Sequence, residues 1–276
     1  MPEGHTLHRL ATSLRDAFAG EVVRVSSPQG RFADSAALLD GTELLGAQSF
    51  GKHLFVEFEQ GREVHVHLGL YGSFVVSPGP APAPVGQVRL RILGRSSYAD
   101  LRGATACELV TAEQRGAILD RLGPDPLDPG ADVDRAWQRI RRSRAPIGGL
   151  LMDQSVLAGV GNVYRAEVLF RHRLHPLRPG NTLRSGQFDA LWTDLVALLA
   201  EGVRVGRIET LRNEHVPDGQ TGSPDGRTGD RRHYVYRQTG NACLVCGSRI
   251  RTAELQGRNL FWCPRCQPAF RSRAVK

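Results

Sequence analysis

The sequence contains almost no lysine. Of its 36 basic residues only Lys52 and Lys276 are lysine, and the other 34 are arginine. A guanidinium is a planar fork of donors, whereas an ammonium is a compact point charge, so the two are not interchangeable. A lysine kept in such a chain is either required as an ammonium or retained by chance. We therefore consider Lys52, in the stretch SFGKHLF, a candidate functional residue.

Long apolar runs are also missing. No stretch approaches the roughly 18 apolar residues that a membrane span needs. Residues 1–20 lack the charged start, apolar core and cleavage site of a secretion signal. We therefore expect a cytoplasmic protein without a membrane segment. With 276 residues and 41% hydrophobic content, the chain can form one large or two modest globular domains.

Acidic residues are nearly absent from the end of the chain. From residue 231 to residue 276 there are ten Lys and Arg against one acid, so this segment carries +9 while the whole chain carries +8. Solvated surface charge is one explanation. With a sequence pI of about 9.8, a polyanionic partner is the other. Nucleic acid is the first candidate, because each neutralised phosphate releases counterions.

The first half of the chain has the pattern of a sheet domain behind one helix. Apolar residues at helical spacing predict a helix over 6–18, ended by Gly20. The period then changes to two in four stretches separated by turn residues. These predicted strands are 53–58, 62–68, 72–76 and 87–93. We predict an antiparallel sheet domain over 2–122, with Cys107 as a small buried hydrophobe.

The second half is predicted to be mainly helical. A proline-studded linker over 123–131 precedes it. Helical patterns cover 132–144, 147–155, 162–171 and 186–201. A helical domain is predicted over 132–232, with a mobile loop at 205–232 because the stretch 217–232 has almost no apolar residue.

Four of the five cysteines form two C-x-x-C pairs in the last domain, predicted over 233–276. They are CLVC (243–246) and CPRC (263–266), and 16 residues separate the pairs. This spacing is typical of a tetrahedral zinc ribbon. We predict one structural zinc ion per chain, bound by Cys243, Cys246, Cys263 and Cys266. Two disulfides are the alternative, which the lack of a secretion signal disfavours.

Two further stretches can bind anions. In QGRNLFWC, Arg258 is expected just before the turn and strand that lead to Cys263, although nine other basic residues of the segment could bind phosphate as well. In LAGVGNVYR, Gly159 and Gly161 allow a tight turn, and Asn162 is expected to cap the helix that follows. Amides at a helix start form an anion site, but plain helix capping explains the pattern too.

The first residues, MPEGHTLHRL, place a proline directly after Met1 and a glutamate directly after the proline. If Met1 is removed, Pro2 ends in a secondary amine, a nucleophile that no side chain offers. While Met1 is attached, the same nitrogen is an unreactive amide. About one residue in twenty is proline, so chance alone explains a Met-Pro start.

Taken together, four motifs resemble the formamidopyrimidine-DNA glycosylase and endonuclease VIII family. They are MPEG, GKHLF, LAGVGNVYRAEVLF and GRNLFWCPRCQ, and they follow the family's order over nearly the whole chain. The resemblance implies a bifunctional DNA glycosylase and abasic-site lyase. It also implies an α+β fold: an N-terminal helix with an antiparallel β-sandwich, a helix-two-turns-helix domain and a zinc-finger hairpin with four cysteine ligands.

The resemblance also assigns roles to individual residues. It implies that Pro2 is the nucleophile and Glu3 the acid/base beside it. Lys52, Asn162 and Arg258 match the family's phosphate-binding residues around a nucleotide turned out of the duplex. The implied partner is double-stranded DNA with damaged bases or abasic sites, and we expect the protein to act as a monomer.

In the stretch HLGLYG, Leu70 and Tyr71 match residues that fill the hole left by the extruded base. The alternative is that they are ordinary residues near a turn. Together with MPEG, this stretch resembles the endonuclease VIII branch, which prefers oxidised pyrimidines.

The chain departs from the family at His5 and Thr6, where Pro-Glu is usual, so a supporting carboxylate is missing. Three hypotheses therefore stay open. They are an oxidised-pyrimidine enzyme, an enzyme for oxidised purines or mainly for abasic sites, and a non-catalytic DNA-binding protein.

Overall fold

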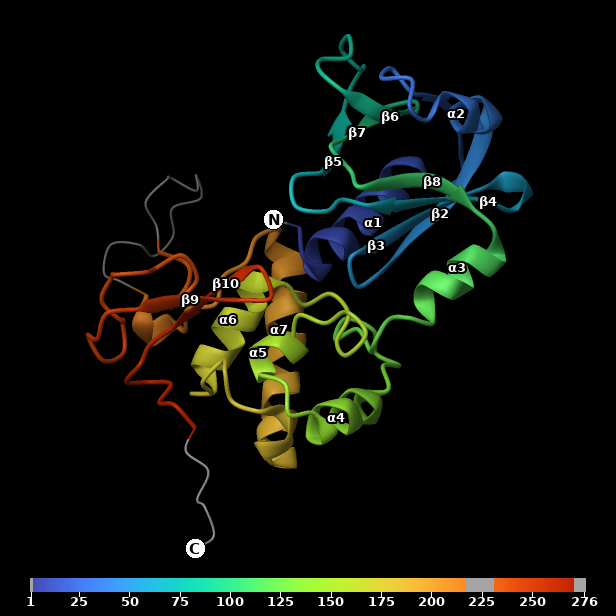
Figure 1. The fold of residues 1–276 in the computed structure, drawn as a ribbon. Helices are drawn as coiled ribbons and strands as arrows, with labels where there is room; N and C mark the ends of the chain where they lie inside the picture. Colours follow the sequence, from blue (N-terminus) through green and yellow to red (C-terminus); the bar gives the residue numbers. More distant parts are fainter. Residues whose placement is uncertain (1, 217–230, 271–276) are drawn as a thin grey trace, which may run out of the picture. The chain divides into compact units, whose positions relative to one another are not determined.

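The computed structural model describes residues 2–216 and 231–270. The chain divides into two compact units, Met1–Leu122 and Gly123–Lys276 (Figure 1). None of the helices in these described ranges has the length and apolar character to span a bilayer.

The N-terminal unit is built on eight antiparallel strands hydrogen-bonded in the order β5-β7-β6-β1-β2-β3-β4-β8. The strands are β1 Glu21–Ser26, β2 Thr42–Phe50, β3 His53–Phe58, β4 Arg62–His67, β5 Ser73–Pro78, β6 Val88–Leu93, β7 Ser97–Arg102 and β8 Ala106–Val110. The first half of β1 pairs with β2 and its second half pairs with β6, so β1 divides the sheet into two halves. Buried side chains from both halves share one core, which confirms the sandwich.

Helix α1 (Gly4–Phe18) packs on this core through the side chains that predicted it. Leu7, Leu10, Leu14 and Phe18 are all buried, and the helix begins two residues before the predicted start. Cys107 belongs to the same core, as expected, and burial raises the pKa of its thiol to about 12. The unit also contains α2 (Ala33–Leu39), η1 (Glu59–Gly61) and α3 (Ala112–Leu119).

The C-terminal unit is helical before its last segment. Its elements are α4 Val133–Arg142, α5 Ile147–Leu150, α6 Asn162–Arg171, η2 Gly180–Thr182, α7 Ser185–Val205 and η3 Asn213–His215. The prediction of α6 is confirmed to the residue. Residues 217–230, half of the predicted mobile loop, lie outside the described residues.

The predicted helix over 147–155 is wrong in length, because α5 ends at Leu150. Two glycines, Gly148 and Gly149, occupy its interior and lower its helical stability. Shortly afterwards the Asp153 carboxylate accepts from the amide and the hydroxyl of Ser155, at 2.9 and 2.7 Å. Such local side-chain bonds offer the backbone an alternative to the helix.

The last described segment is a small hairpin. Strands β9 (Arg251–Leu255) and β10 (Arg258–Trp262) pair antiparallel. Phe261 of β10 lies in a hydrophobic cluster with Val163 and Phe170 of α6, so the hairpin is packed against that helix.

Candidate active site and metal centre

Pro2 and Glu3 lie at the start of α1. Glu3 occupies the N-cap position in an extended conformation, and its side chain makes no capping bond. The Thr6 amide instead donates to the Glu3 carbonyl at 2.9 Å. The Glu3 side chain is fully buried, and because the apolar face of α1 is embedded in the core, the dipeptide is held on a rigid element.

His5, the first departure from the family pattern, is also buried. Burial lowers the pKa of its imidazole to about 4, and the positive N-terminus acts in the same direction. Its Nε2 lies 3.2 Å from the Thr6 hydroxyl. A neutral imidazole and a hydroxyl therefore stand where the family usually has a proline and a carboxylate.

Lys52 lies in the two-residue turn that joins β2 to β3, directly before the first residue of β3. The turn places Phe50 opposite His53. Gly51, the first turn residue, has φ of 58°, a conformation that glycine adopts without strain. The tight hairpin fixes the backbone that carries the Lys52 ammonium.

Beside Lys52 lies a histidine cluster that motif reasoning missed. His53 and His65 are stacked at 5.2 Å between ring centroids, and His53 lies 5.0 Å from His67. Burial is the main cause that lowers the pKa of all three imidazoles, that of His53 to about 3. The positive charge of Lys52 also lowers the pKa of His53 and His67.

The cluster has a defined hydrogen-bond order. His65 Nδ1 lies 3.2 Å from Glu108 Oε1, and His65 Nε2 lies 2.9 Å from His53 Nδ1. An ionised carboxylate only accepts, so His65 Nδ1 donates to it and His65 Nε2 then accepts from His53. The signal was present in the sequence, because VHVH places two histidines on one face of a strand and His53 sits on its neighbour.

Leu70 and Tyr71 lie in the turn between β4 and β5. The Tyr71 side chain is 92% exposed and that of Leu70 is 37% exposed, whereas most large apolar residues of the unit are buried. The glycines on either side keep this turn tight. A Cβ on Gly69 would lie 2.5 Å from Thr105 Cγ2, and one on Gly72 would lie 2.2 Å from the Leu68 carbonyl oxygen.

In the C-terminal unit, Asn162 is the first residue of α6 and not its cap. The N-cap residue is Gly161, and the Asn162 side-chain oxygen accepts instead from Arg165 Nη2. The predicted capping role is therefore wrong, because a guanidinium one turn along the helix occupies the amide oxygen.

Arg258 is the first residue of β10 and follows the hairpin turn, which corrects its expected place before the turn. The turn residues Gln256 and Gly257 both have positive φ, 53° and 69°. That is the pattern of a two-residue hairpin turn. Arg258 pairs with Leu255 across the hairpin and lines a pocket of about 440 Å³ with Arg165 and Asp153.

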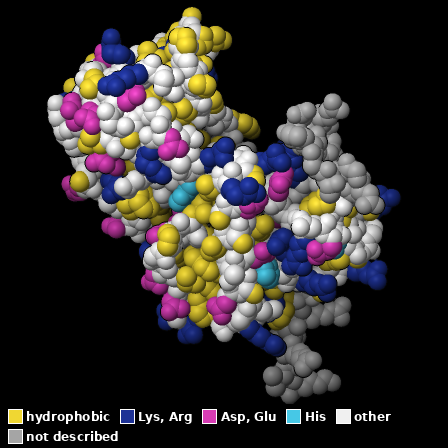
Figure 2. All heavy atoms as spheres, turned by 180° about the vertical axis from the view of Figure 1, so that it is seen from behind, with side chains coloured by type: hydrophobic (Ala, Val, Ile, Leu, Met, Phe, Trp, Pro, Cys, Tyr) yellow, Lys and Arg dark blue, Asp and Glu magenta, His cyan; other side chains and the backbone are white. Residues whose placement is uncertain are grey.

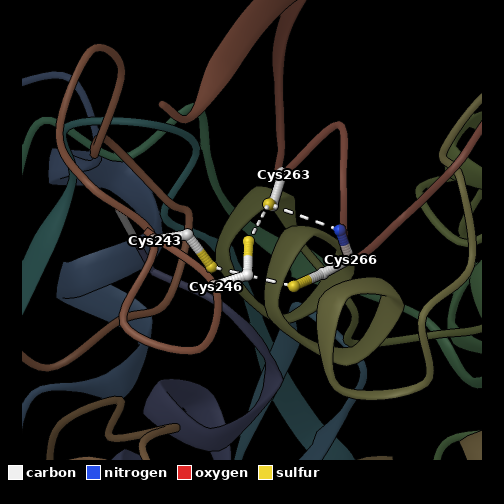
Figure 3. Close-up of side chains that lie close together, drawn as sticks. All are labelled: Cys243, Cys246, Cys263 and Cys266. Atoms are coloured by element: carbon white, nitrogen blue, oxygen red, sulfur yellow. Dashed lines mark hydrogen bonds between the residues drawn. The ribbon is translucent and has the colours of Figure 1, made fainter. Parts of the chain in front are cut away.

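The four cysteines of the two C-x-x-C pairs lie close together, and Cys263 directly follows β10 (Figure 3). Their sulfur atoms lie within 4.8 Å of one another, with 3.4 Å between Cys246 and Cys263 and 3.9 Å between Cys243 and Cys266. Four sulfurs at zinc–sulfur distance on a tetrahedron are about 3.8 Å apart, so the thiols fit one zinc ion. All four positions are protein ligands, so the ion would be structural.

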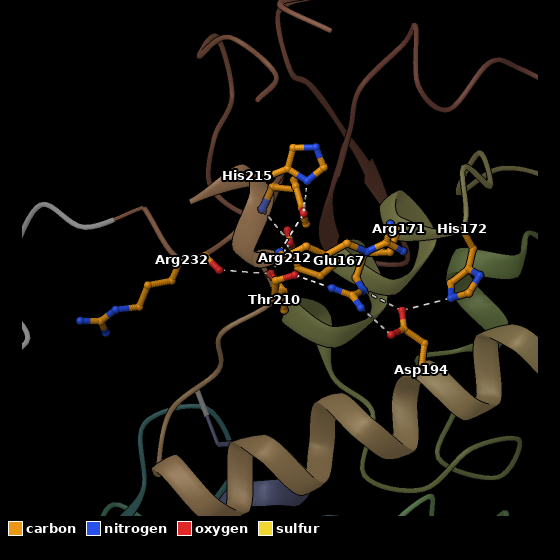
Figure 4. A network of polar contacts seen from close by, with 9 residues as sticks. Glu167, Arg171, His172, Asp194, Thr210, Arg212, His215 and Arg232 are labelled. Atoms are coloured by element: carbon orange, nitrogen blue, oxygen red, sulfur yellow. Dashed lines mark hydrogen bonds and ion pairs between the residues drawn. The ribbon is translucent and has the colours of Figure 1, made fainter. Parts of the chain in front are cut away.

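Two buried polar side chains anchor the finger to the helices. Glu167 of α6 accepts from the amides of residues 234–236 at 2.7–2.8 Å. It also accepts from the Thr210 hydroxyl at 2.6 Å (Figure 4). Gln267 accepts from the Cys263 amide and donates to the Leu174 carbonyl, at 3.0 and 2.8 Å. Sequence reasoning missed both, because neither motif nor spacing reveals which polar residue is buried.

Basic side chains are not confined to the finger. On the face seen in Figure 2, Lys and Arg side chains lie on both units and are interspersed with acidic ones.

Comparison with protein families gives three matches. The formamidopyrimidine-DNA glycosylase N-terminal domain matches residues 1–107, the formamidopyrimidine-DNA glycosylase H2TH domain matches residues 122–213, and the zinc finger found in FPG and IleRS matches residues 240–269. With the clustered thiols, the last match confirms the predicted structural zinc site.

Individual relatives agree with these matches. "Endonuclease 8 1" of Mycobacterium tuberculosis is 54% identical over 97% of this chain and all of the relative. A formamidopyrimidine-DNA glycosylase of Thermus thermophilus is 32% identical over 97% of this chain and 98% of its own length. The Lactococcus lactis Fpg, solved with abasic-site DNA, has a TM-score of 0.79 at 22% identity, covering 97% of this chain and 100% of its own.

Proposed function

The chain belongs to the formamidopyrimidine-DNA glycosylase and endonuclease VIII family, and from this premise we propose that it removes oxidised pyrimidines from double-stranded DNA. As a member of that family it is a bifunctional DNA glycosylase and abasic-site lyase. The endonuclease VIII relative, at 54% identity against 32% for a formamidopyrimidine-DNA glycosylase, favours the pyrimidine branch.

The observation that carries the catalytic assignment is the placement of Pro2 and the buried Glu3 on a core-anchored helix. With Met1 removed, the Pro2 amine attacks the sugar C1′, a nitrogen–carbon bond forms and the bond to the damaged base breaks. The amine is secondary, so once its proton is lost and the C1′–O4′ bond of the sugar ring breaks, with a proton going to O4′, the C1′–N link is an iminium that stays cationic. This cation draws electrons from C2′, whose proton is then removed as the 3′ phosphate bond breaks. A second elimination breaks the 5′ phosphate bond.

Glu3 serves as the acid/base of these steps. It delivers a proton to the opening sugar ring and takes one back, because a carboxyl group within reach of the ring atoms can do both. The neutral His5 supplies no second carboxylate, so Glu3 carries this work without the family's usual partner.

Lys52, Asn162 and Arg258 bind the phosphates that flank the extruded nucleotide. Lys52 lies in a hairpin turn, Asn162 at the start of a helix and Arg258 at the start of a strand. The exposed Tyr71 and Leu70 enter the hole in the duplex, where a flat ring and an apolar wedge replace the lost stacking. One chain carries the whole set, so we propose a monomer acting in the bacterial cytoplasm.

A panel of duplexes with one lesion each tests this function. Protein beginning at Pro2 should process thymine glycol and 5-hydroxyuracil at least about tenfold faster than 8-oxoguanine, because a site that hydrogen-bonds one kind of base leaves polar groups unpaired with another. Glu3→Gln should slow excision of an intact lesion by about 100-fold or more, and slow cleavage of a preformed abasic site less. Faster processing of 8-oxoguanine would assign the purine branch, and cleavage of abasic sites alone would assign a lyase.

A further inference from the structure

Arg165 of α6 is the largest fully buried side chain in the described part of the chain. Its exposed fraction is 1%, although an arginine is among the costliest residues to bury. A buried guanidinium is tolerated when acceptors surround its donors. Its contacts therefore show what it holds in place.

The guanidinium contacts three separate segments. Nη2 donates to the Asn162 side-chain oxygen and, at 3.1 Å, to the Asn259 carbonyl. Nη1 donates to the Gly148 carbonyl at 3.2 Å. One side chain thus joins the start of α6, the helix α5 and the strand β10, at the residue next to Arg258.

The contact with Asn162 fixes which way its amide faces. A guanidinium can only donate, so the atom that faces Arg165 is the amide oxygen. The NH2 group of Asn162 consequently points away from Arg165. An NH2 group can donate a hydrogen bond to a phosphate oxygen, so this orientation suits the binding of an anion.

The contact with the Asn259 carbonyl joins Arg165 to β10, one residue after Arg258. A Cβ on Gly149 would lie 3.0 Å from Gln256 Oε1, and one on Gly148 would lie 3.0 Å from the Pro176 carbonyl oxygen, so α5 lies close against its neighbours. Arg165 and Arg258 line the same pocket, yet Arg165 is buried and its Nη1 and Nη2 atoms already donate to protein acceptors.

We propose that Arg165 is a positioning residue that sets the Asn162 amide and the Arg258 guanidinium in the arrangement that receives DNA phosphate. The inference rests on the proposed function, because that function makes Asn162 and Arg258 phosphate contacts. Arg165 itself touches no DNA in this arrangement. Its loss should therefore act only through the two residues that it positions.

A double-mutant cycle tests this, with affinity measured on a duplex containing one tetrahydrofuran abasic analogue. A lysine cannot form the fork that reaches all three acceptors, so Arg165→Lys should weaken binding about tenfold and lower the salt dependence. In an Arg258→Ala or Asn162→Ala background the further loss should be under about threefold, because coupled sites are not additive. The same tenfold loss in both backgrounds would overturn the proposal.

Arg171→Lys is the matched control. Arg171 is a partly buried arginine on the same helix, and it pairs with Asp194 at 2.7 Å and with the Thr210 carbonyl. Arg171→Lys should lower the stability of the protein. Any loss of DNA affinity that it causes should be the same in the Arg258→Ala background as in the unsubstituted protein. If Arg258→Ala and Asn162→Ala alone leave affinity and salt dependence unchanged, the phosphate roles fail. If Arg258→Ala and Asn162→Ala both lower the affinity but Arg165→Lys causes its full tenfold loss in each of these backgrounds, only the positioning role fails.

Asn162→Asp decides the case if Arg165→Lys does not fold. The aspartate still accepts from Arg165, so the protein should remain folded with its zinc. It lacks the NH2 group, so binding should weaken at least as much as in Asn162→Ala. Binding like that of the unsubstituted protein would show that Arg165 does not orient a donor toward DNA.

Discussion

The two units hold their proposed DNA-contact residues in different ways. In the N-terminal unit, Pro2, Glu3 and Lys52 sit on a helix and a hairpin that are fixed by an apolar core. In the C-terminal unit, Asn162 and Arg258 depend on buried polar groups and on a four-cysteine cluster. The small finger has too few apolar residues to fold on burial alone. The N-terminal unit, with the proposed catalytic residues, should therefore remain folded after changes that disrupt the proposed DNA contacts of the C-terminal unit.

Removal of the zinc ion should produce the largest difference in behaviour between the two units. Structural zinc contributes about 10–16 kcal/mol to the folding of small fingers, so Cys263→Ser should release the ion and unfold the hairpin. Affinity for abasic-analogue DNA should fall on the order of 100-fold as phosphate contacts are lost. The N-terminal unit should unfold at an unchanged temperature. Elemental analysis, calorimetry and binding measurements check these outcomes.

Cys107→Ser is the matched control, because Cys107 lies in the N-terminal core. It should keep its zinc and lose about 1–3 kcal/mol of stability from a buried hydroxyl. Retention of zinc by Cys263→Ser, or its loss from Cys107→Ser, would contradict the comparison.

Substitution of the buried Glu167 should have the next largest effect. Glu167→Gln replaces an acceptor oxygen by an NH2 group that faces backbone amides, so about 3–5 kcal/mol of stability should be lost from the C-terminal unit. Hydrogen exchange should then rise at the amides of residues 234–236. Glu201→Gln removes an exposed pair with Arg204 and should cost under about 1 kcal/mol. Protection of these amides in Glu167→Gln would contradict the anchoring role.

Mild acid should affect the N-terminal unit through its histidines. The pKa values of His5 and His53, about 4 and 3 in the folded chain, lie below the ordinary 6.5 because of burial. These two histidines therefore bind protons more readily in the unfolded chain than in the folded chain, and the free energy of unfolding falls as pH drops below 6.5. At pH 5 each histidine should cost about 2 kcal/mol.

By contrast, the pKa of Asp194 in the C-terminal unit is about 2. Burial acts to raise it, but hydrogen bonds from His172 and Arg171 outweigh that effect. The stability that this carboxylate provides is lost only below pH 3.8.

A double variant of His5→Asn and His53→Asn tests the histidine assignment. The unfolding free energy of its N-terminal unit should depend less on pH between pH 7 and 5. An unchanged pH dependence in that variant would contradict the assignment.

The sequence was most informative where periodicity or spacing maps directly onto geometry. The helix 162–171, the strand 53–58 and the cysteine cluster all follow from such rules. Strands β1, β2, β7 and β8 were not predicted, because Arg24, Gly46, Asp100 and Glu108 interrupt their apolar runs. The predicted cap at Asn162 was wrong because Arg165, one turn along the same helix, occupies the amide oxygen. The spacing allows this pair, but the carbonyls of Gly148 and Asn259 that also bind the guanidinium come from segments that only the fold brings together.

Chemistry at Pro2 is the central claim, and borohydride trapping tests it most directly. Hydride reduces an iminium to a stable amine, so protein beginning at Pro2 should give a covalent adduct with abasic-site DNA. Any residue left before Pro2 should abolish the adduct, because an acylated nitrogen has no available lone pair. Mass spectrometry should place the link on the N-terminal peptide. Mature protein that binds the abasic duplex but gives no adduct, or an adduct on another residue, would contradict the account.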